Sequence, residues 1–231
     1  MNIDNPELLE RYHKVLNHIR KLDPDQKVSL LAVSKTKPIE DIICLAEAGQ
    51  KSFGENYLQE ALTKISARPD LDWHFIGPIQ SNKTKPIAEH FNWVHSVDRL
   101  KIAQRLSNQR PTNLPPLKIL LEVNVDAEES KSGFTPDEVI SVAAEIAELP
   151  NLALRGLMAI PAHHDTLETQ RRPFRKMREL LETLQLQLPE QNLDTLSMGM
   201  SSDLEAAILE GATIVRIGTD IFGAREVKNN A

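Results

Sequence analysis

Residues 28–38 have the sequence VSLLAVSKTKP. This stretch decides between two α/β folds, a closed barrel and an open doubly wound sheet. Its apolar part predicts a buried strand over residues 28–35, and Pro38 is suited to begin a helix. A doubly wound open sheet would be favoured by a glycine-rich dinucleotide fingerprint directly after this strand. The turn that stands there contains no glycine. The stretch therefore favours a closed barrel over the open sheet.

On both sides of this stretch, strand patterns alternate with helical ones. An amphipathic helix is expected first, over residues 5–22, and the longest strand over residues 117–125. Asp98 is the expected cap of one helix, and Thr135 with Glu138 has the spacing of a capping box at another. The eight expected strands cover residues 28–35, 52–56, 73–77, 93–97, 117–125, 152–160, 195–200 and 213–218. Such an α/β chain predicts a single (β/α)8 TIM-type barrel with an extra N-terminal helix.

The composition is ordinary for one globular domain covering residues 1–231. The net charge of −6 argues against a broad basic surface for nucleic acid. No apolar run approaches the roughly 18 residues of a membrane helix, and the N-terminus lacks a signal-peptide pattern, so the cytoplasm is the expected location. Cys44 is the only cysteine, which excludes an intrachain disulfide and a CxxC metal site. No metal is expected.

Two of the expected strands contain polar side chains whose burial would cost free energy. Alternation along residues 117–125 places Glu122 and Asn124 on one face, and alternation along residues 213–218 separates Arg216 from its apolar neighbours. If the apolar sets face the helices, these polar side chains point into the barrel. A buried charge is tolerated only when it is paired or bound. The pattern predicts a polar ligand in the barrel mouth, at the C-terminal ends of the strands.

Two turns at the last strand ends are suited to an anion. Residues 197–203 read SMGMSSD and residues 216–219 read RIGT, so both combine a glycine with hydroxyl side chains. The simpler interpretation of Ser201, Ser202 and Asp203 alone is a helix cap. Two matching turns after strands seven and eight, the common phosphate site of barrel enzymes, favour phosphate instead.

Lys35 stands at the end of the first strand, where a solvated surface charge is the ordinary interpretation. Here it follows an apolar strand and lies two residues before Lys37, on the same face if the strand continues. Partial burial and a like charge both lower a lysine pKa, as Schiff-base formation requires. A lysine opposite a phosphate site suggests pyridoxal phosphate. Schiff-base chemistry of the aldolase type on a phosphorylated sugar is the alternative.

With these residues, the sequence resembles the pyridoxal phosphate homeostasis protein family, related to the N-terminal barrel domain of alanine racemase, over about residues 5–226. The landmarks are AVSKTK at 32–37, FGENY at 53–57, HFIGPIQSNK at 74–83, EESKSG at 128–133, RGLMAIP at 155–161, SMGMSSD at 197–203 and RIGTDIFG at 216–223. The resemblance implies the fold of this racemase domain, pyridoxal phosphate fold type III, and pyridoxal 5′-phosphate as a Schiff base on Lys35. It implies that Arg216 lies beside the pyridine nitrogen. The other implied ligand residues are Ser201, Ser202, Gly218 and Thr219 around the phosphate, and Asn56, His74 and Met200 near the ring.

The resemblance further implies a binding role in vitamin B6 homeostasis and in amino- and keto-acid balance, with cofactor released to apo-enzymes that require it. The chain ends at Ala231, close to the barrel, so we expect no second racemase domain, no efficient catalysis and a monomer. Tyr12 is expected in the core, and Tyr57 either lines the mouth or packs. The alternative function is a slow amino-acid racemase that depends on pyridoxal phosphate.

Several charged features carry less weight. Lys131 is either a second lysine that accepts cofactor or, as we favour, a solvated loop charge. The sequence HHD at 163–165 has adjacent side chains that rarely converge on one metal ion, so a solvated loop is favoured. The basic residues between 171 and 178 are expected on a solvated helix face. Residues that are expected at the rim of the pocket are Gln80, Lys83 and Lys85.

Overall fold

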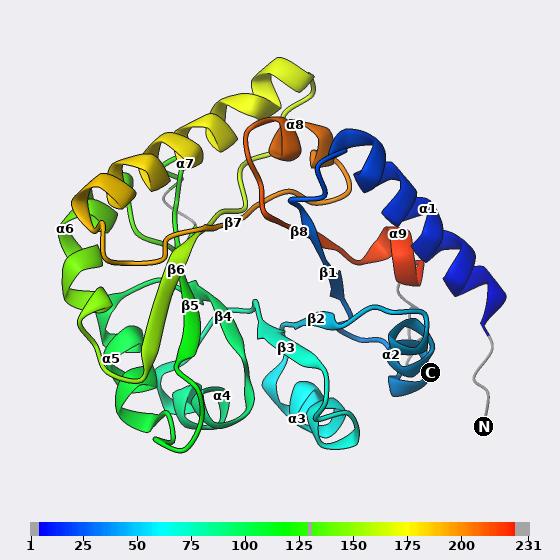
Figure 1. Cartoon of the computed structure of the whole chain (residues 1–231), viewed down its shortest axis with the longest axis horizontal. Helices are drawn as coiled ribbons and strands as arrows, with labels where there is room; N and C mark the ends of the chain where they lie inside the picture. Colours follow the sequence, from blue (N-terminus) through cyan, green and yellow to red (C-terminus); the bar gives the residue numbers. More distant parts are fainter. Residues whose placement is uncertain (1–4, 129–130, 225–231) are drawn as a thin grey trace, which may run out of the picture.

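The computed structural model describes residues 5–128 and 131–224, and its centre is a closed barrel of eight parallel strands in the order β1 to β8 (Figure 1). β1 pairs with β2 on one side and with β8 on the other, which closes the sheet. The predicted barrel is therefore confirmed. Glu129 and Ser130 of the landmark at 128–133, and the first four residues of the chain, lie outside the description.

The strands and helices alternate as predicted, with small shifts at their ends. The strands are β1 (Ser29–Val33), β2 (Ser52–Glu55), β3 (Asp72–Phe75), β4 (Trp93–Val97), β5 (Leu117–Glu122), β6 (Leu152–Met158), β7 (Thr195–Ser197) and β8 (Ile214–Ile217). The helices are α1 (Pro6–Leu22), α2 (Ile39–Glu47), α3 (Leu58–Ala67), α4 (Thr84–His90), α5 (Leu100–Gln109), α6 (Pro136–Ala147), α7 (Leu167–Gln187), α8 (Leu204–Leu209) and α9 (Thr219–Phe222), with a short 3₁₀ turn, η1 (Ser81–Lys83), before α4.

Of the two helix N-caps that the sequence predicted, one is present and the other is not. The capping box of Thr135 and Glu138 is present at α6. Asp98 does not cap α5: Arg99 occupies the cap position, and the Asp98 carboxylate accepts a hydrogen bond from the Arg99 guanidinium instead. Arginine offers five donors, so it competes with backbone N–H groups for a neighbouring carboxylate. β6, with seven residues, is longer than β5, because the ladder of β5 stops at Glu122.

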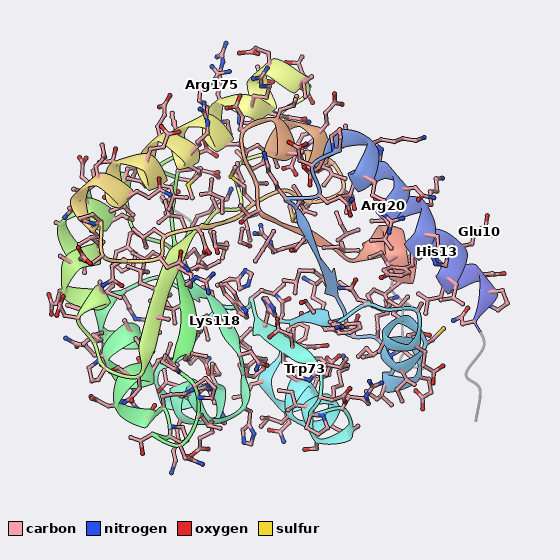
Figure 2. The ribbon with its side chains drawn as sticks, in the orientation of Figure 1. Glu10, His13, Arg20, Trp73, Lys118 and Arg175 are labelled. Atoms are coloured by element: carbon pink, nitrogen blue, oxygen red, sulfur yellow. The ribbon has the colours of Figure 1, made fainter. Side chains whose placement is uncertain are left out.

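The core has an outer layer between strands and helices and a smaller cluster inside the barrel. Alternation along β3 shows this division. Trp73 lies between β3 and α3 and donates to the carbonyl of Arg68 at the end of α3 (Figure 2). His74 points to the other side, into the barrel, where it stacks on Trp93 with 5.4 Å between ring centroids. Leu120 and Met158 form the inner cluster with Trp93. No helix in the described part of the chain is long and apolar enough to cross a membrane.

α1, the first helix of the chain, packs against α9, the last helix that the structure describes. Its face that carries Leu8 and Tyr12 is buried, as the amphipathic pattern predicted. Arg11 donates a hydrogen bond of 2.8 Å from Nε to the carbonyl of Ile221 in α9. Figure 1 shows α1 (blue) running beside α9 (red), with α8 close to its other end. The extra N-terminal helix therefore covers the seam where β1 meets β8.

Candidate functional site

The turn that contains Lys35 is held from both sides by α3. Lys64 donates to the carbonyl oxygen of Ser34 at 2.8 Å, and Glu60 accepts from the backbone N–H of Thr36 at 2.7 Å. These two groups belong to the peptide units that flank Lys35. Thr36 has a φ of 64°, a left-handed conformation that costs energy for a β-branched residue. The contacts from α3 compensate for this strain and fix the backbone of Lys35, whose side chain is partly exposed.

A buried acid lies beneath this turn. Glu55, at the end of β2, is fully buried and accepts hydrogen bonds from the Ser34 hydroxyl at 2.6 Å and from the Lys64 ammonium at 2.7 Å. Burial raises the pKa of Glu55, and the nearby positive charge of Lys64 opposes this shift. The second carboxylate oxygen of Glu55 has no hydrogen-bond partner among the described residues. The turn therefore rests on a charged network with one unused acceptor.

Lys37 does not lie on a continuation of the strand, so the expectation that it acts on Lys35 from the same face is wrong. β1 ends at Val33, and the left-handed turn at Thr36 redirects the chain. The ammonium of Lys37 donates instead to the carbonyls of Phe222, Gly223 and Ala224, at the C-terminal end of α9. Lysine is favourable there because it satisfies carbonyls that lack helical partners.

Arg216 is buried in the barrel interior. Its NH1 donates to the Ser197 hydroxyl at 2.7 Å, and its NH2 donates to the Ala159 carbonyl at 3.0 Å. Burial lowers the pKa of Arg216 to about 10, with Asp203 and Glu122 opposing, so the guanidinium is charged at neutral pH. Burial, with Asp98 nearby, raises the pKa of Glu122 to about 7, and Arg216 opposes this shift. Glu122 and Arg216 are thus within electrostatic reach of each other, as the alternation suggested.

Asn124 has a different role from the one expected. Its side-chain oxygen accepts from the backbone N–H of Glu128 at 3.1 Å, and its Nδ2 donates to the Glu128 carbonyl at 2.8 Å. The side chain therefore shapes the loop after β5 and does not serve the barrel interior. β5 ends two residues earlier, so strand alternation no longer applies at Asn124.

Asn56 follows β2 and offers an acceptor with no partner. Its Oδ1 is buried and unbonded among the described residues. Gly77 packs against it so closely that a Cβ at that position would lie 2.4 Å from the Asn56 backbone oxygen. Asn56 is therefore held by backbone contact, while its buried side-chain oxygen remains available to a ligand donor.

The turn after β8 lies beside the start of the Lys35 turn, and the turn after β7 shares a hollow with it through Ser201 and Thr219. A Cβ at Gly218 would lie 3.3 Å from the carbonyl oxygen of Val33, the last residue of β1. Asp203 does not cap α8: its carboxylate accepts from the backbone N–H of Met200 at 2.7 Å and shapes the turn after β7. Ser201, Ser202 and Thr219 are exposed, and Met200 is 36% exposed. The interpretation of Asp203 as a side-chain cap of α8 is therefore wrong.

The sequence did not predict that α1 takes part in this region. A hollow of about 490 Å³ is lined by Ser201 and Thr219 together with the basic face of α1. The basic residues that line it are Arg11, Lys14 and His18. A helix far from strands seven and eight in sequence thus brings basic side chains to the hydroxyl-rich turns, where the carboxylate of Asp220 also lines the hollow.

His74 has no free ring nitrogen. Its Nδ1 lies 2.8 Å from Nε2 of His95, and its Nε2 lies 3.0 Å from the carboxylate of Asp72. His95 and Ser197 were missed by sequence reasoning, although alternation in residues 93–97 places His95 on the face of Trp93. His95 is fully buried, and its Nδ1 lies 2.8 Å from the Ser197 hydroxyl.

The remaining charged features have local partners. Lys131 lies 2.6 Å from Glu128 and also donates to the Ile160 carbonyl. The basic start of α7 is not simply a solvated face, because Arg171, Arg175 and Arg178 converge on buried Glu210. His163 lies 3.4 Å from Asp165. Lys85 lies 3.8 Å from Glu89. Within residues 5–128 and 131–224, no three His, Cys, Asp or Glu side chains are grouped so that they could hold a metal ion.

A closed parallel barrel with a lysine after β1 and hydroxyl-rich turns after β7 and β8 defines a class of α/β barrel, and residues 3–226 match the alanine racemase N-terminal domain. Within that class, the chain belongs to the pyridoxal phosphate homeostasis protein family. It is 62% identical over 201 residues to the pyridoxal phosphate homeostasis protein of Pseudomonas aeruginosa, covering 86% of this chain and 85% of that one. The corresponding protein of Haemophilus influenzae is 57% identical over 202 residues, with coverage of 86% and 85%.

Solved structures agree with this assignment. PipY of Synechococcus elongatus with pyridoxal phosphate bound is 36% identical, with a TM-score of 0.83, covering 94% of this chain and all of that chain. Alanine racemase of Corynebacterium glutamicum is 16% identical, with a TM-score of 0.68, covering 93% of this chain and 62% of that one. At that identity the racemase shares the fold alone.

Proposed function

We propose that this protein binds pyridoxal 5′-phosphate covalently through Lys35 and maintains its supply without efficient catalysis of its own. The observation that carries the proposal is the turn at Lys35, which α3 holds on both sides and which adjoins the Gly218 turn. The names of the relatives and the PipY structure with pyridoxal phosphate bound support the choice of cofactor.

The residues around this turn fit the cofactor. Asn56 has a buried oxygen without a partner among the described residues, which suits a donor on the ring. Arg216 has donors beyond the two that bind Ser197 and Ala159, which suits the pyridine nitrogen. Met200 and His74 would lie near the ring, with His74 acting through its neighbours because both its nitrogens are engaged. The residues that would surround the phosphate are Ser201, Ser202, Gly218 and Thr219.

The chemistry follows from these side chains. The Nζ of Lys35 would condense with the aldehyde of the cofactor, and one water would leave, giving a reversible Schiff base. Arg216 remains protonated at neutral pH, so it donates to the pyridine nitrogen without transferring its proton. When bound, the cofactor supplies an electron sink, and an unprotonated pyridine nitrogen makes that sink weaker. Such a site suits holding the cofactor better than carbanion chemistry.

A protein of this kind would limit the free concentration of a reactive aldehyde and pass it to apo-enzymes that require it. Racemisation needs an acid and a base on opposite sides of the substrate. Tyr12 does not serve, because it is buried and its hydroxyl bonds to Gln50. Tyr57 is 51% exposed after β2, so Tyr57→Phe tests its contribution to any residual racemisation.

The first test is the absorbance spectrum of protein incubated with pyridoxal phosphate, before and after borohydride. We expect a band near about 420 nm that borohydride abolishes, with the reduced cofactor found on the peptide containing Lys35. Lys35→Ala should lack the band, whereas Lys27→Ala, at an exposed lysine before the N-terminal end of β1, should retain it. A wild type without the band would overturn the proposal and favour a sugar phosphate as the Schiff-base partner.

A second test separates homeostasis from catalysis. We expect no substantial racemisation of alanine or other amino acids by the loaded protein, and measurable transfer of cofactor to an apo-enzyme. Rapid racemisation by the wild type that Lys35→Ala abolishes would contradict the homeostasis role as the whole function.

A further inference from the structure

Five side chains form an unbroken line of hydrogen bonds through the barrel. Arg216 NH1 lies 2.7 Å from the Ser197 hydroxyl, which lies 2.8 Å from Nδ1 of His95. Nε2 of His95 lies 2.8 Å from Nδ1 of His74, whose Nε2 lies 3.0 Å from Asp72. The line crosses from β8 through β7, β4 and β3. Asp72 is the first residue of β3, so the line ends at the face of the barrel opposite the strand ends that hold Lys35.

The two ends of the line determine its direction. Arginine only donates, and an ionised carboxylate only accepts. Burial lowers the pKa of His74, although its hydrogen bond to Asp72 opposes the shift. Burial, with His74 and Arg216 nearby, lowers the pKa of His95 well below the ordinary value. Both rings are therefore neutral at pH 7, and each donates once and accepts once.

Only one arrangement of hydrogens then satisfies every link. Arg216 donates to Ser197, and Ser197 donates to Nδ1 of His95. His95 donates from Nε2 to His74, and His74 donates from Nε2 to Asp72. Both histidines must carry their hydrogen on Nε2. Aligned hydrogen bonds in a buried environment polarise one another, so the charge on Asp72 supports every link up to Arg216.

The interior leaves this line little freedom. His74 is 3% exposed, His95 and Ser197 are fully buried, and Arg216 is 5% exposed. Asp72 is the accessible end, with 37% of its side chain exposed and with the Ser52 hydroxyl as a further partner at 3.3 Å. Burial raises the pKa of Asp72, but the hydrogen bond from His74 and the electrostatic effect of that ring, with Lys118 and the Ser52 hydroxyl, lower it overall, so Asp72 is ionised at neutral pH.

We propose that Asp72, His74, His95 and Ser197 form a directional relay that orients Arg216, and that Asp72 is a positioning residue for the ligand site from the opposite face of the barrel. The consequence for pyridoxal phosphate rests on the proposed function; the relay itself does not. Asp72 touches no ligand in this account. It acts by fixing which nitrogen of each histidine carries the hydrogen.

The direction of the relay is tested in protein without cofactor. Long-range proton–nitrogen NMR of the imidazole rings should show both His74 and His95 protonated at Nε2, because that nitrogen is the donor in each. Protonation of either ring at Nδ1 would overturn the relay. The signals can be assigned with His74→Gln and His95→Gln.

The action of Asp72 on Arg216 is tested in the same protein with Asp72→Asn. An amide presents either its oxygen or its NH₂ to His74, so it no longer enforces one direction. We expect mixed histidine tautomers and a shifted Nε–H signal of Arg216, whereas Asp70→Asn, at an exposed acid paired with Arg68, should leave both unchanged. An unchanged Arg216 signal in folded Asp72→Asn would overturn the proposal.

Ser197→Ala distinguishes a relay from a field acting through space. It removes one hydroxyl and cuts the line next to Arg216. In this background Asp72→Asn should no longer shift the Arg216 signal, and an undiminished shift would contradict transmission through Ser197.

Cofactor binding provides the last measurement. We expect Asp72→Asn to weaken retention of pyridoxal phosphate by about twofold to thirtyfold, the range of coupling through such networks. If the wild type binds no pyridoxal phosphate, the proposed function fails, while the NMR results still decide the relay. If the wild type binds it and Asp72→Asn binds it equally well, the positioning role fails.

Discussion

Glu122 is the residue whose protonation should most visibly change with pH. Its pKa in the folded protein is about 7, because of burial and Asp98, against an ordinary value of 4.5. The folded state therefore holds this proton at pH values where the unfolded state has released it. The contribution of Glu122 to stability is complete below about pH 4.5 and is lost as the pH rises through 7.

Glu122→Gln should remove this loss. Between pH 4.5 and 8 the wild type should lose up to about 3 kcal/mol more unfolding free energy than the variant. Partial exposure of Glu122 makes this figure an upper bound. Urea unfolding at pH 5 and pH 8 measures the difference, with Glu89→Gln as a control in a surface ion pair. The same pH dependence in wild type and Glu122→Gln would show that Glu122 does not hold its proton.

At the scale of single residues, the sequence predicted the residues of the candidate site. It did not predict the residues that form hydrogen bonds with them. Lys35, Arg216 and the turn at 197–203 stand out because costly polar groups or small residues follow apolar strands. The groups that hold them are distant in sequence: Lys64 is 30 residues from Ser34, and Ser197 is 102 residues from His95. Such pairs are set by barrel closure, which no local pattern encodes.

Among the elements, α3 has a task beyond covering β2 and β3. It supplies Glu60 and Lys64, which hold the peptide units on either side of Lys35. The sequence predicted this helix from its apolar positions alone. Nothing in the local sequence of residues 58–67 points to this task, because the strain at Thr36 is visible only in the backbone angles.

Glu60→Ala should destabilise the turn that contains Lys35 without creating a cavity in the core. It removes the acceptor of the Thr36 N–H, and we expect a loss of about 1–2 kcal/mol in unfolding free energy. The absorbance band from Lys35 should form more slowly, because the turn then samples other conformations. Gln59→Ala, on the exposed face of the same helix, is the matched control. If Glu60→Ala and Gln59→Ala load pyridoxal phosphate at equal rates, α3 does not position Lys35.

The boundaries of elements were the weaker part of the predicted fold. Every strand except β4 ends earlier than predicted, because the last residues of each predicted strand leave the ladder at the barrel mouth. α9 was not predicted, since four residues are too few to show helical periodicity. The capping box at Thr135 was predicted correctly because both of its partners lie within one turn.

For the molecule as a whole, α1 is the element whose contribution is easiest to measure. Leu8 is fully buried between α1 and the rest of the protein. Leu8→Ala should lower the unfolding free energy by about 2–5 kcal/mol, through lost burial and a residual cavity. Glu10→Ala, on the outer side of the same helix (Figure 2), should change it by less than about 0.5 kcal/mol. Equal effects would mean that α1 is not part of the cooperative core.

The same unfolding curves bear on a prediction that so far rests on sequence. If residues 1–231 form one domain, the wild type should unfold in a single transition that absorbance, fluorescence and circular dichroism report identically. Light scattering on the eluting protein tests the expected monomer. Two transitions, or the mass of a dimer, would contradict these expectations.

The pairing of β1 with β8 also has a consequence for how the chain is made. Synthesis begins at the N-terminus, so β1 leaves the ribosome long before its partner at residues 214–217 exists. Until β8 is made, this apolar strand has a free edge of unpaired backbone N–H and C=O groups, and such edges pair readily with other chains. α1, made just before β1, is positioned to shield that edge until β8 arrives. A nascent chain stalled before residue 214 and lacking α1 should therefore aggregate, or recruit chaperones, more than one that retains α1.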